Sequence, residues 1–471
     1  MFRKWFFNLI YLVLLAVFSP LLVYRALKHG KYRYGFKQKY FGRIPRRRNV
    51  LARIGVVDSP AAKIVWFHAV SVGEVNLLRP ILKLIRESKP HWHCVVSTTS
   101  LTGMELALKL FGDELTVFYC PLDFSWAVDK AIQRLRPDLL VLAEQELWPN
   151  LISIAKQYGT KVAIINGRFS ETGYKRYLWV RRFIAPMFRQ IDIIAAQSET
   201  YAGWFHRLGA SADSIRVIGS MKFDGAKSDR NNPETQYLKS LAGISDDDIV
   251  FLAGSTQAPE EAFAVECYEN LKNDFPRLRL ILVPRHPERF EEVAALLEAK
   301  AVLWQRRSKL YEVQEDNDTD FLSSSSDSNS GILEGESSRK AVKPRILLVD
   351  TIGELGSWWG TASIAFVGGS MGQRGGQNMI EPAAYGAAVC FGPNTKNFRD
   401  IVDLILRDNA AQVVHDQHEM EQFVRRCLEE PEVAEQLSMR AKKLVDRQLG
   451  ATKRTLEMLE TLFLADDGYK K

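Results

Sequence analysis

The chain has 471 residues, of which 46% are hydrophobic and 25% are charged. This composition excludes an intrinsically disordered protein, and the length is sufficient for two domains with packed cores. The five cysteines are widely spread and show neither the CxxC spacing of a metal site nor a disulfide framework, so we expect a reducing, cytoplasmic environment.

The positive charge lies at the amino terminus, where no acidic residue precedes Asp58. The segment before Asp58 carries more positive charge than the net charge of +7 of the whole chain, so the remainder of the chain is mildly acidic. Nucleic acid is therefore not an expected partner.

An uncharged run, Trp5–Tyr24, has about the length needed to cross a bilayer core. A cleaved signal peptide and a buried core helix are alternatives, but no small-residue cleavage pattern follows the run. We therefore expect a retained membrane-anchoring helix within residues 1–27, either spanning the bilayer or lying in one leaflet. By the positive-inside rule, the basic segment 28–62 predicts a cytoplasmic location for the rest of the chain, and it would meet anionic lipids of the inner membrane.

From residue 63 to residue 226, apolar runs alternate with helical patterns. This alternation predicts parallel βαβ units in a first α/β domain. The expected strands are KIVWFH, HCVVSTTS, LTVFYC, DLLVLAE, KVAIIN, DIIAAQS and RVIGS.

The polar stretch 227–246 predicts a linker, and a second α/β domain is expected over residues 247–435. Its predicted strands are IVFLAGST, RLILVPRH, RILLVD, SIAFVGGS and AAVCFG. Residues 315–340 are acidic and rich in serine, which indicates a flexible insertion, and residues 436–471 predict a helical tail. Two doubly wound domains of this kind are expected to face each other across a cleft formed by the carboxyl ends of their strands.

Three charged residues follow strands of the first domain. Glu74 begins a helix in HAVSVGE, where it is either a functional carboxylate or simply an acid favoured by the helix dipole. Glu144 and its neighbour Glu146 end another strand, and a salt bridge is the plain explanation for them. Lys222, in GSMKFD, is either a salt-bridge partner or a group that stabilises charge during a reaction.

The second domain offers candidate phosphate contacts. Arg285, after the strand RLILVP, could bind a phosphate or tie down its loop. The glycine-rich stretch FVGGSMGQRGGQNMIEPAAYG runs into a helix, which indicates an anion site. It matches neither GxGxxG nor GxxxxGK[ST], so a dehydrogenase and a P-loop ATPase are disfavoured.

Together these motifs resemble the 3-deoxy-D-manno-octulosonic acid (Kdo) transferases of lipopolysaccharide synthesis, which are inverting glycosyltransferases of the GT-B fold. The similarity runs in order through nearly the whole chain. Its motifs are HAVSVGE, STTSLTG, PLD, ELWPN, NGRFS, QSE, GSMKFD, GST, VPRHPERF, GEL, FVGGS, GGQNMIEPAAYG, GPNTKNF and GATKRTLE. The resemblance implies two Rossmann-like domains facing across a cleft.

The resemblance also implies roles for individual residues. Glu74 matches the family's general base, and Glu144 and Lys222 match positions implicated in stabilising the transition state. The positions that match the CMP-binding stretches are Pro284, Arg285, Gly353, Glu354, Leu355, Asn378, Met379, Ile380 and Glu381.

The implied donor is CMP-Kdo, and the implied acceptor is a lipid A precursor in the inner membrane. The family works without a metal or cofactor, and the sequence offers no convincing metal cluster. Residues 76–90 could contact acyl chains, or their leucines and isoleucines could simply cover the sheet. Trp358 and Trp359 are expected to pack in the interior, with base stacking as the alternative. The rival functions are a UDP-sugar glycosyltransferase or epimerase, and a catalytically silent membrane protein that binds nucleotides or anionic lipids.

Overall fold

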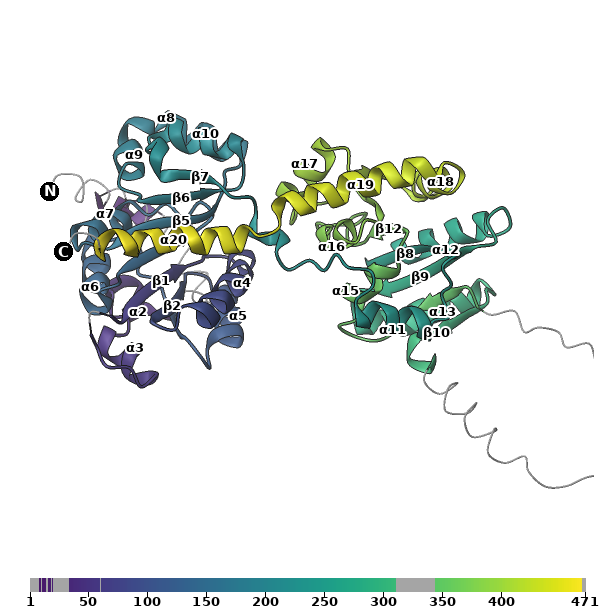
Figure 1. Ribbon diagram of the computed structural model, residues 1–471, viewed down its shortest axis with the longest axis horizontal. Coiled ribbons are helices and arrows are strands. Elements are labelled where there is room, and N and C mark those ends of the chain that lie inside the picture. Colours follow the sequence, from purple (N-terminus) through teal and green to yellow (C-terminus); the bar gives the residue numbers. More distant parts are fainter. Residues whose placement is uncertain are drawn as a thin grey trace, which may run out of the picture. The chain divides into compact units, whose positions relative to one another are not determined.

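The computed structural model describes residues 8–9, 11–13, 16–17, 19, 34–59, 61–310 and 344–467. Most of the predicted anchor, Trp5–Tyr24, and the whole predicted insertion, 315–340, lie outside these ranges. Among the described residues, no helix combines the length and apolar character that crossing a membrane requires. The chain divides into two compact units, which are Met1–Gly225 with Gln448–Lys471, and Ala226–Arg447 (Figure 1).

Unit 1 is built on a seven-stranded parallel sheet in the order β3-β2-β1-β4-β5-β6-β7. The strands are β1 (Lys63–His68), β2 (Trp92–Thr98), β3 (Thr116–Tyr119), β4 (Leu139–Ala143), β5 (Lys161–Gly167), β6 (Ile193–Ala196) and β7 (Ile215–Val217). All seven predicted runs are therefore confirmed as strands. Their connections are α4 (Val72–Ser88), α5 (Leu101–Phe111), α6 (Ser125–Leu135), α7 (Pro149–Gln157), α8 (Glu171–Trp179), α9 (Arg181–Phe188) and α10 (Glu199–Leu208).

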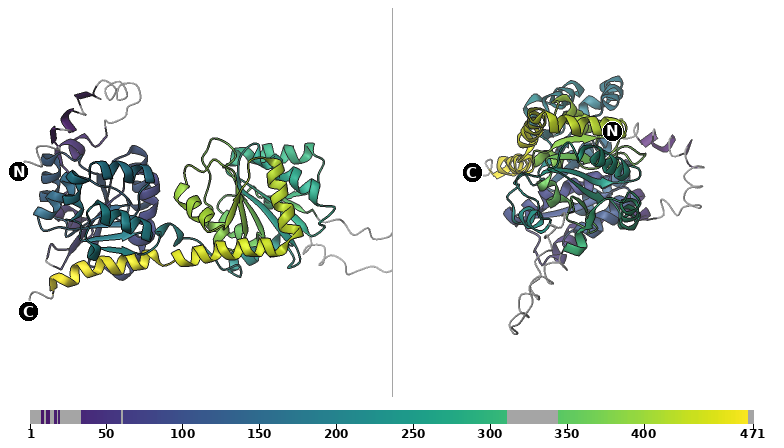
Figure 2. Two further views of the ribbon diagram at one scale, coloured as in Figure 1. Left: turned by 90° about the horizontal axis from the view of Figure 1, so that it is seen from above. Right: turned by 90° about the vertical axis from the view of Figure 1, so that its right-hand side faces the viewer.

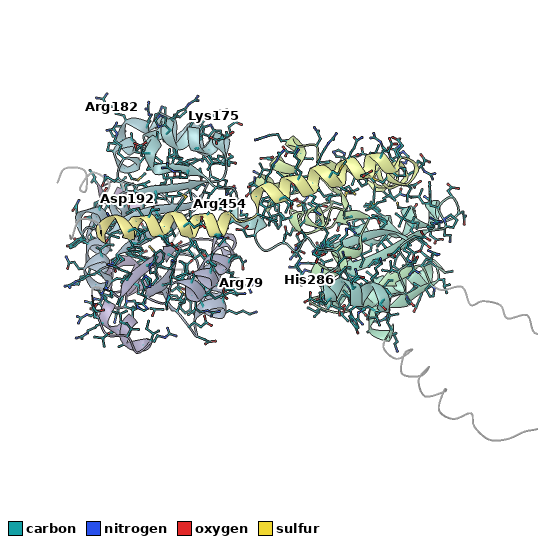
Figure 3. The ribbon with its side chains drawn as sticks, viewed as in Figure 1. Arg79, Lys175, Arg182, Asp192, His286 and Arg454 are labelled. Carbon is teal, nitrogen blue, oxygen red and sulfur yellow. The ribbon has the colours of Figure 1, made fainter. Side chains whose placement is uncertain are left out.

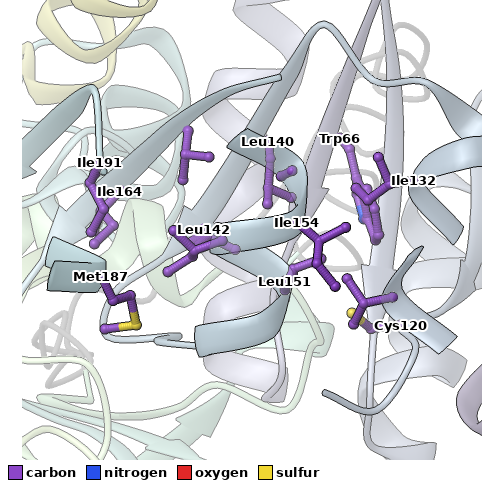
Figure 4. Close-up of a cluster of buried hydrophobic side chains, with 14 of the residues drawn as sticks. Trp66, Cys120, Ile132, Leu140, Leu142, Leu151, Ile154, Ile164, Met187 and Ile191 are labelled. Atoms are coloured by element: carbon purple, nitrogen blue, oxygen red, sulfur yellow. The ribbon is translucent and has the colours of Figure 1, made fainter. Parts of the chain in front are cut away.

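Helices cover both faces of this sheet because its strands are apolar on both sides. Trp66 and its neighbours on one face pack against α6, α7 and α9, as the cluster in Figure 4 shows. Val65 and Phe67 point to the other face, where α4 and α5 cover them. The carboxyl-terminal helix α20 (Ala451–Asp467) also packs on this second face, although it follows the last strand of unit 1 by more than 200 residues (Figure 2). The basic segment before β1 contains α2 (Phe36–Phe41) and α3 (Arg47–Arg53), whose Val50 and Leu51 join the core.

Unit 2 holds a second seven-stranded parallel sheet in the order β10-β11-β9-β8-β12-β13-β14. Its strands are β8 (Ile249–Thr256), β9 (Leu278–Pro284), β10 (Trp304–Arg306), β11 (Ile346–Leu348), β12 (Ile364–Val367), β13 (Ala388–Phe391) and β14 (Ala411–Val413). Its helices are α11 (Pro233–Leu241), α12 (Glu260–Leu271), α13 (Phe290–Ala299), α15 (Leu355–Trp358), α16 (Ile380–Ala384), α17 (Arg399–Arg407), α18 (Gln417–Glu429) and α19 (Pro431–Gln448).

The structure refines the predicted segments in two places. The stretch 227–246, predicted as a linker, contains α11, which begins at Pro233 because Asn232 accepts a hydrogen bond from the Thr235 amide as an N-cap. Within the predicted tail 436–471, the described residues form the second part of α19, which lies in unit 2 up to Arg447, and α20, which lies in unit 1. Two Rossmann-like units with parallel sheets are thus confirmed.

Candidate active site

The predicted catalytic residues of unit 1 follow the carboxyl ends of neighbouring strands. Glu74 follows β1 and Glu144 follows β4, and the strand order reverses between these two strands. In an open α/β sheet, this reversal opens a crevice in which ligands bind. Lys222 reaches the same edge from a 3₁₀ turn, Met221–Phe223, that follows β7.

Glu74 lies in the first turn of α4, as the helix-dipole alternative requires, and its functional role stays a prediction. Ser71 caps α4 by accepting the Glu74 amide, while the Glu74 carboxylate accepts hydrogen bonds from the Val70 amide at 2.7 Å and the Ser71 hydroxyl at 3.0 Å. Burial raises the pKa of Glu74 above its ordinary value, and the negative charge of Glu144 raises it further. A carboxylate with a raised pKa is a better proton acceptor than an exposed glutamate.

Glu144 is the centre of a buried charge network. Only 6% of the residue is exposed, and its carboxylate contacts Arg168 at 2.7 Å and Lys222 at 3.1 Å. The side-chain NH₂ of Asn166 donates to the same carboxylate at 3.4 Å, and the side-chain oxygen of Asn166 accepts the Met221 backbone N–H at 3.0 Å. Asn166 therefore links Glu144 to the turn that carries Lys222.

A third carboxylate, Glu146, lies beside the other two. Burial raises the pKa of Glu146 to about 7, and the charge of Glu74 adds to the effect. The Trp148 indole N–H donates to Glu146 at 2.9 Å. Glu146 can therefore take up a proton near neutral pH, beside two further carboxylates and the cations that contact Glu144.

Backbone strain marks the same edge of both sheets. Glu144 after β4, Asn166 in β5 and Ser255 in β8 have φ angles of 53°, 53° and 55°. Residues other than glycine rarely occupy this region, and such strain concentrates at functional sites. Nothing in the sequence pattern indicates it.

In unit 2, the predicted CMP-binding residues also gather after neighbouring strands. Arg285 follows Pro284, the last residue of β9, and its backbone N–H donates to the Thr256 carbonyl at the end of β8. Its side chain is exposed, and its positive charge lowers the pKa of Glu381, which burial raises. Arg285 and Glu381 therefore lie in one neighbourhood, while Asn378 donates to Glu381 at 3.0 Å.

Two residues of this predicted set are packed inward. The side chains of Met379 and Ile380 are buried at 0% and 2% exposure, so they support the loop that carries Asn378 rather than offering side chains to a ligand.

The carboxylate of Glu354 has internal partners. Arg307 donates to both of its oxygens, at 3.0 and 2.8 Å, and Thr351 donates at 2.7 Å. Gly353 before it has a φ of 92°, and Leu355 after it begins α15. Arg307 is 1% exposed, and no sequence motif indicates its role.

The first amides of the predicted anion loop bind a side chain of the protein itself. Glu260 accepts the backbone N–H groups of Gly369, Ser370 and Met371 at 2.8 to 2.9 Å, and also that of Gln257. The anion that these three amides receive is therefore an internal carboxylate. Gly368 is required there, because a Cβ atom would lie 2.6 Å from Thr256 and 2.8 Å from Glu260.

Two further sequence expectations are decided by burial. The leucines and isoleucines of α4 are buried, which confirms the alternative that they cover the sheet. They are Leu77, Leu78, Ile81, Leu82 and Ile85. Trp358 and Trp359 are buried, which confirms packing.

Within the described ranges, no group of three or more His, Cys, Asp or Glu side chains is arranged to hold a metal ion. Asn166 and Arg168 lie in the motif NGRFS, and sequence reasoning missed them as site residues. Their position at the carboxyl end of β5, which pairs with β4, is a signal that could have identified them.

Comparison with known proteins gives consistent results. Residues 38–225 match the family model described as 3-Deoxy-D-manno-octulosonic-acid transferase (kdotransferase). The 3-deoxy-D-manno-octulosonic acid transferase of Haemophilus influenzae is 30% identical over 421 residues, covering 88% of this chain and 92% of that protein. The enzyme of the same name from Bordetella pertussis is 31% identical over 413 residues, covering 85% and 88%.

Among solved structures, the UDP-GlcNAc 2-epimerase from Neisseria meningitidis bound to UDP-GlcNAc matches with a TM-score of 0.52 and 12% identity. The match covers 85% of this chain and 100% of that one. At this identity the similarity concerns the fold alone, and it agrees with two Rossmann-like units.

Proposed function

This chain belongs to the Kdo transferase family of glycosyltransferases, and from that premise we propose that it transfers Kdo from CMP-Kdo to a lipid A precursor in lipopolysaccharide synthesis, with inversion of the anomeric centre. The observation that carries the proposal is the site in unit 1. There, the Glu74 carboxylate, whose pKa is raised by burial and by the charge of Glu144, provides a proton acceptor, and Glu144 contacts Lys222 at 3.1 Å. Such a site suits the attack of a sugar hydroxyl on an activated glycosyl donor.

In the proposed reaction, Glu74 takes the proton of an acceptor hydroxyl as its oxygen forms a bond to the anomeric carbon of Kdo. The bond from that carbon to the CMP phosphate oxygen breaks, and the electron pair leaves with CMP. A single displacement of this kind attacks the face opposite the leaving group, so it inverts the configuration. The two hydrogen bonds to Glu74 fix the carboxylate in one orientation, which is the requirement for a positioned base.

Glu144 and the two cations have a supporting role in this scheme. A Lys222 ammonium beside the reacting carbon stabilises the negative charge that develops as the donor bond breaks. Glu144 holds that ammonium in position and, with its own negative charge, keeps Glu74 basic. Arg168 balances the charge of Glu144.

Unit 2 is proposed to hold the donor. Arg285 is exposed after β9 and would form charge-assisted hydrogen bonds with the phosphate of CMP. The Glu381 carboxylate would accept hydrogen bonds from the ribose hydroxyls, and the Asn378 side chain would donate to them. Glu354 would act by shaping its loop, since Arg307 and Thr351 hold its carboxylate.

We further propose that the reaction needs no metal or cofactor and takes place at the cytoplasmic face of the inner membrane. The uncharged run Trp5–Tyr24 and the basic segment after it support this location. Full activity in the presence of a chelator would agree with the first statement, and loss of activity would contradict it.

Mass analysis of the product tests the proposed function. The intact protein is incubated with a tetra-acylated lipid A precursor and either CMP-Kdo or a UDP-sugar. We expect the acceptor to gain the mass of Kdo only with CMP-Kdo, with release of CMP. A product from a UDP-sugar, or CMP binding without any transfer by the folded protein, would overturn the proposal.

A further inference from the structure

The outer face of α8 and α9 combines positive charge with exposed aromatic side chains. Between residues 171 and 190 there are five Lys or Arg residues and a single acid, Glu171. Trp179 is 90% exposed and Phe183 is 56% exposed. Isolated exposed apolar residues are ordinary, but a nearly bare tryptophan among cations is characteristic of an interaction surface.

These side chains are exposed on both helices. Lys175, Arg176 and Trp179 lie on the last two turns of α8, and Arg182 and Phe183 lie on the first turn of α9, which begins at Arg181. Lys175 and Arg182 point away from the body of unit 1 (Figure 3). We name these five residues the α8–α9 surface.

The opposite side of the two helices is anchored in the core. Tyr174, Ile184, Met187 and Phe188 are buried in the hydrophobic cluster of unit 1. The outward direction of Trp179 is therefore fixed by packing and is not a consequence of a loosely held helix. The surface is presented on rigid elements.

The α8–α9 surface lies next to the edge of the unit 1 sheet where the strands have their carboxyl ends. Ser170, two residues after Arg168, caps α8 by accepting the Gly173 amide at 3.1 Å. On the inner side of α8, burial raises the pKa of Tyr177, and the charge of Glu146 raises it further, so Tyr177 lies close to this carboxylate. The surface thus begins beside the residues that carry the proposed chemistry.

We propose that the α8–α9 surface docks unit 1 onto an anionic lipid bilayer, with Trp179 and Phe183 at the level of the head groups and the cations on lipid phosphates. Tryptophan is enriched at membrane interfaces, and basic side chains near a membrane are attracted by its negative surface potential. Lys175 pairs with Glu171 at 2.7 Å, so the positive charge that matches a negatively charged bilayer comes mainly from Arg176 and Arg182. This contact is separate from the predicted amino-terminal anchor and from the basic segment 28–62.

The test uses a reporter on the surface, because the rest of the chain can also bring the protein to a vesicle. All five native cysteines are buried, so a cysteine introduced at the surface can be labelled selectively. Leu178→Cys, next to Trp179 and 37% exposed, is labelled with the polarity-sensitive dye NBD in the full chain. Met439→Cys, 56% exposed in unit 2, is the matched control position.

Labelled protein is mixed with vesicles of phosphatidylcholine containing phosphatidylglycerol, and with phosphatidylcholine alone. We expect the NBD emission at position 178 to rise and shift to the blue with anionic vesicles only, and the emission at position 439 to remain unchanged. Added salt should weaken the response, because it screens exposed charges. No Kdo donor or acceptor is present, so the result does not depend on the proposed reaction.

Arg176→Gln with Arg182→Gln should remove most of this response, whereas Lys442→Gln with Lys443→Gln, an equal charge change on exposed positions of α19, should leave it intact. The proposal is wrong if position 178 keeps its aqueous emission on vesicle-bound protein, or if the first pair of substitutions has no effect. Either result would exclude an anionic bilayer as the partner of the α8–α9 surface.

Discussion

Among single residues, Arg285 offers the most direct test of the proposed donor binding. Arg285→Ala should weaken CMP binding roughly tenfold or more, because a charge-assisted contact to phosphate is lost. The exposed Arg277→Ala on the same unit, which removes an equal charge, should leave CMP affinity unchanged. Calorimetric titration of both variants with CMP compares them. Equal affinity in the two variants would remove Arg285 from the donor site.

The charge of Glu144 gives Glu74 a testable pH dependence. A general base must be ionised, and burial with the charge of Glu144 raises the pKa of Glu74, so kcat/KM should fall with decreasing pH earlier than for an ordinary glutamate. Glu144→Gln removes the negative neighbour and lowers the pKa of Glu74. The acid limb of the kcat/KM profile should therefore move to lower pH, even though the maximal rate falls. An acid limb that stays in place would separate Glu144 from Glu74.

At the scale of elements, Glu260 connects α12 to the loop after β12. Its carboxylate accepts four backbone N–H groups, and a glutamine would turn a donor NH₂ toward some of them. Glu260→Gln should lower the free energy of unfolding by about 1–3 kcal/mol, as measured in urea. Glu266→Gln, a change of the same kind on α12, serves as the control. Equal stability of the two variants would contradict this role of Glu260.

Asp123 has a comparable role in unit 1. It accepts the Asn150 and Leu151 amides at the start of α7, at 3.0 and 2.7 Å, so it caps that helix from outside. Asp123→Ala should therefore destabilise the fold by about 1–2 kcal/mol. Thermal unfolding followed by circular dichroism measures the loss. An unchanged midpoint would show that another group satisfies these amides.

Much of the fold could be predicted, because parallel strands buried on both faces are continuous apolar runs. The two strands of unit 2 that sequence reasoning missed, β10 and β14, are three residues long and lie at the two edges of the sheet. An edge strand needs less apolar surface, so WQR and AQV carry no clear pattern.

The site was predictable only in part, because some of its contacts join segments that are far apart in the sequence. Glu74, Glu144 and Lys222 could be selected because they follow apolar runs, and the structure brings Glu144 and Lys222 into contact. The pairing of Arg307 with Glu354, and the capture of loop amides by Glu260, join segments that are about 50 and 110 residues apart. Such pairings depend on tertiary packing and leave no trace in local spacing.

For the whole molecule, we propose that unit 1 carries out proton transfer and that unit 2 binds the donor. The most direct test measures both in Glu74→Gln, with Glu87→Gln as an exposed control on the same helix. We expect Glu74→Gln to bind CMP like the unmodified protein but to transfer Kdo at least about a hundredfold more slowly, and Glu87→Gln to do both normally. Near-normal Kdo transfer by folded Glu74→Gln would contradict the account.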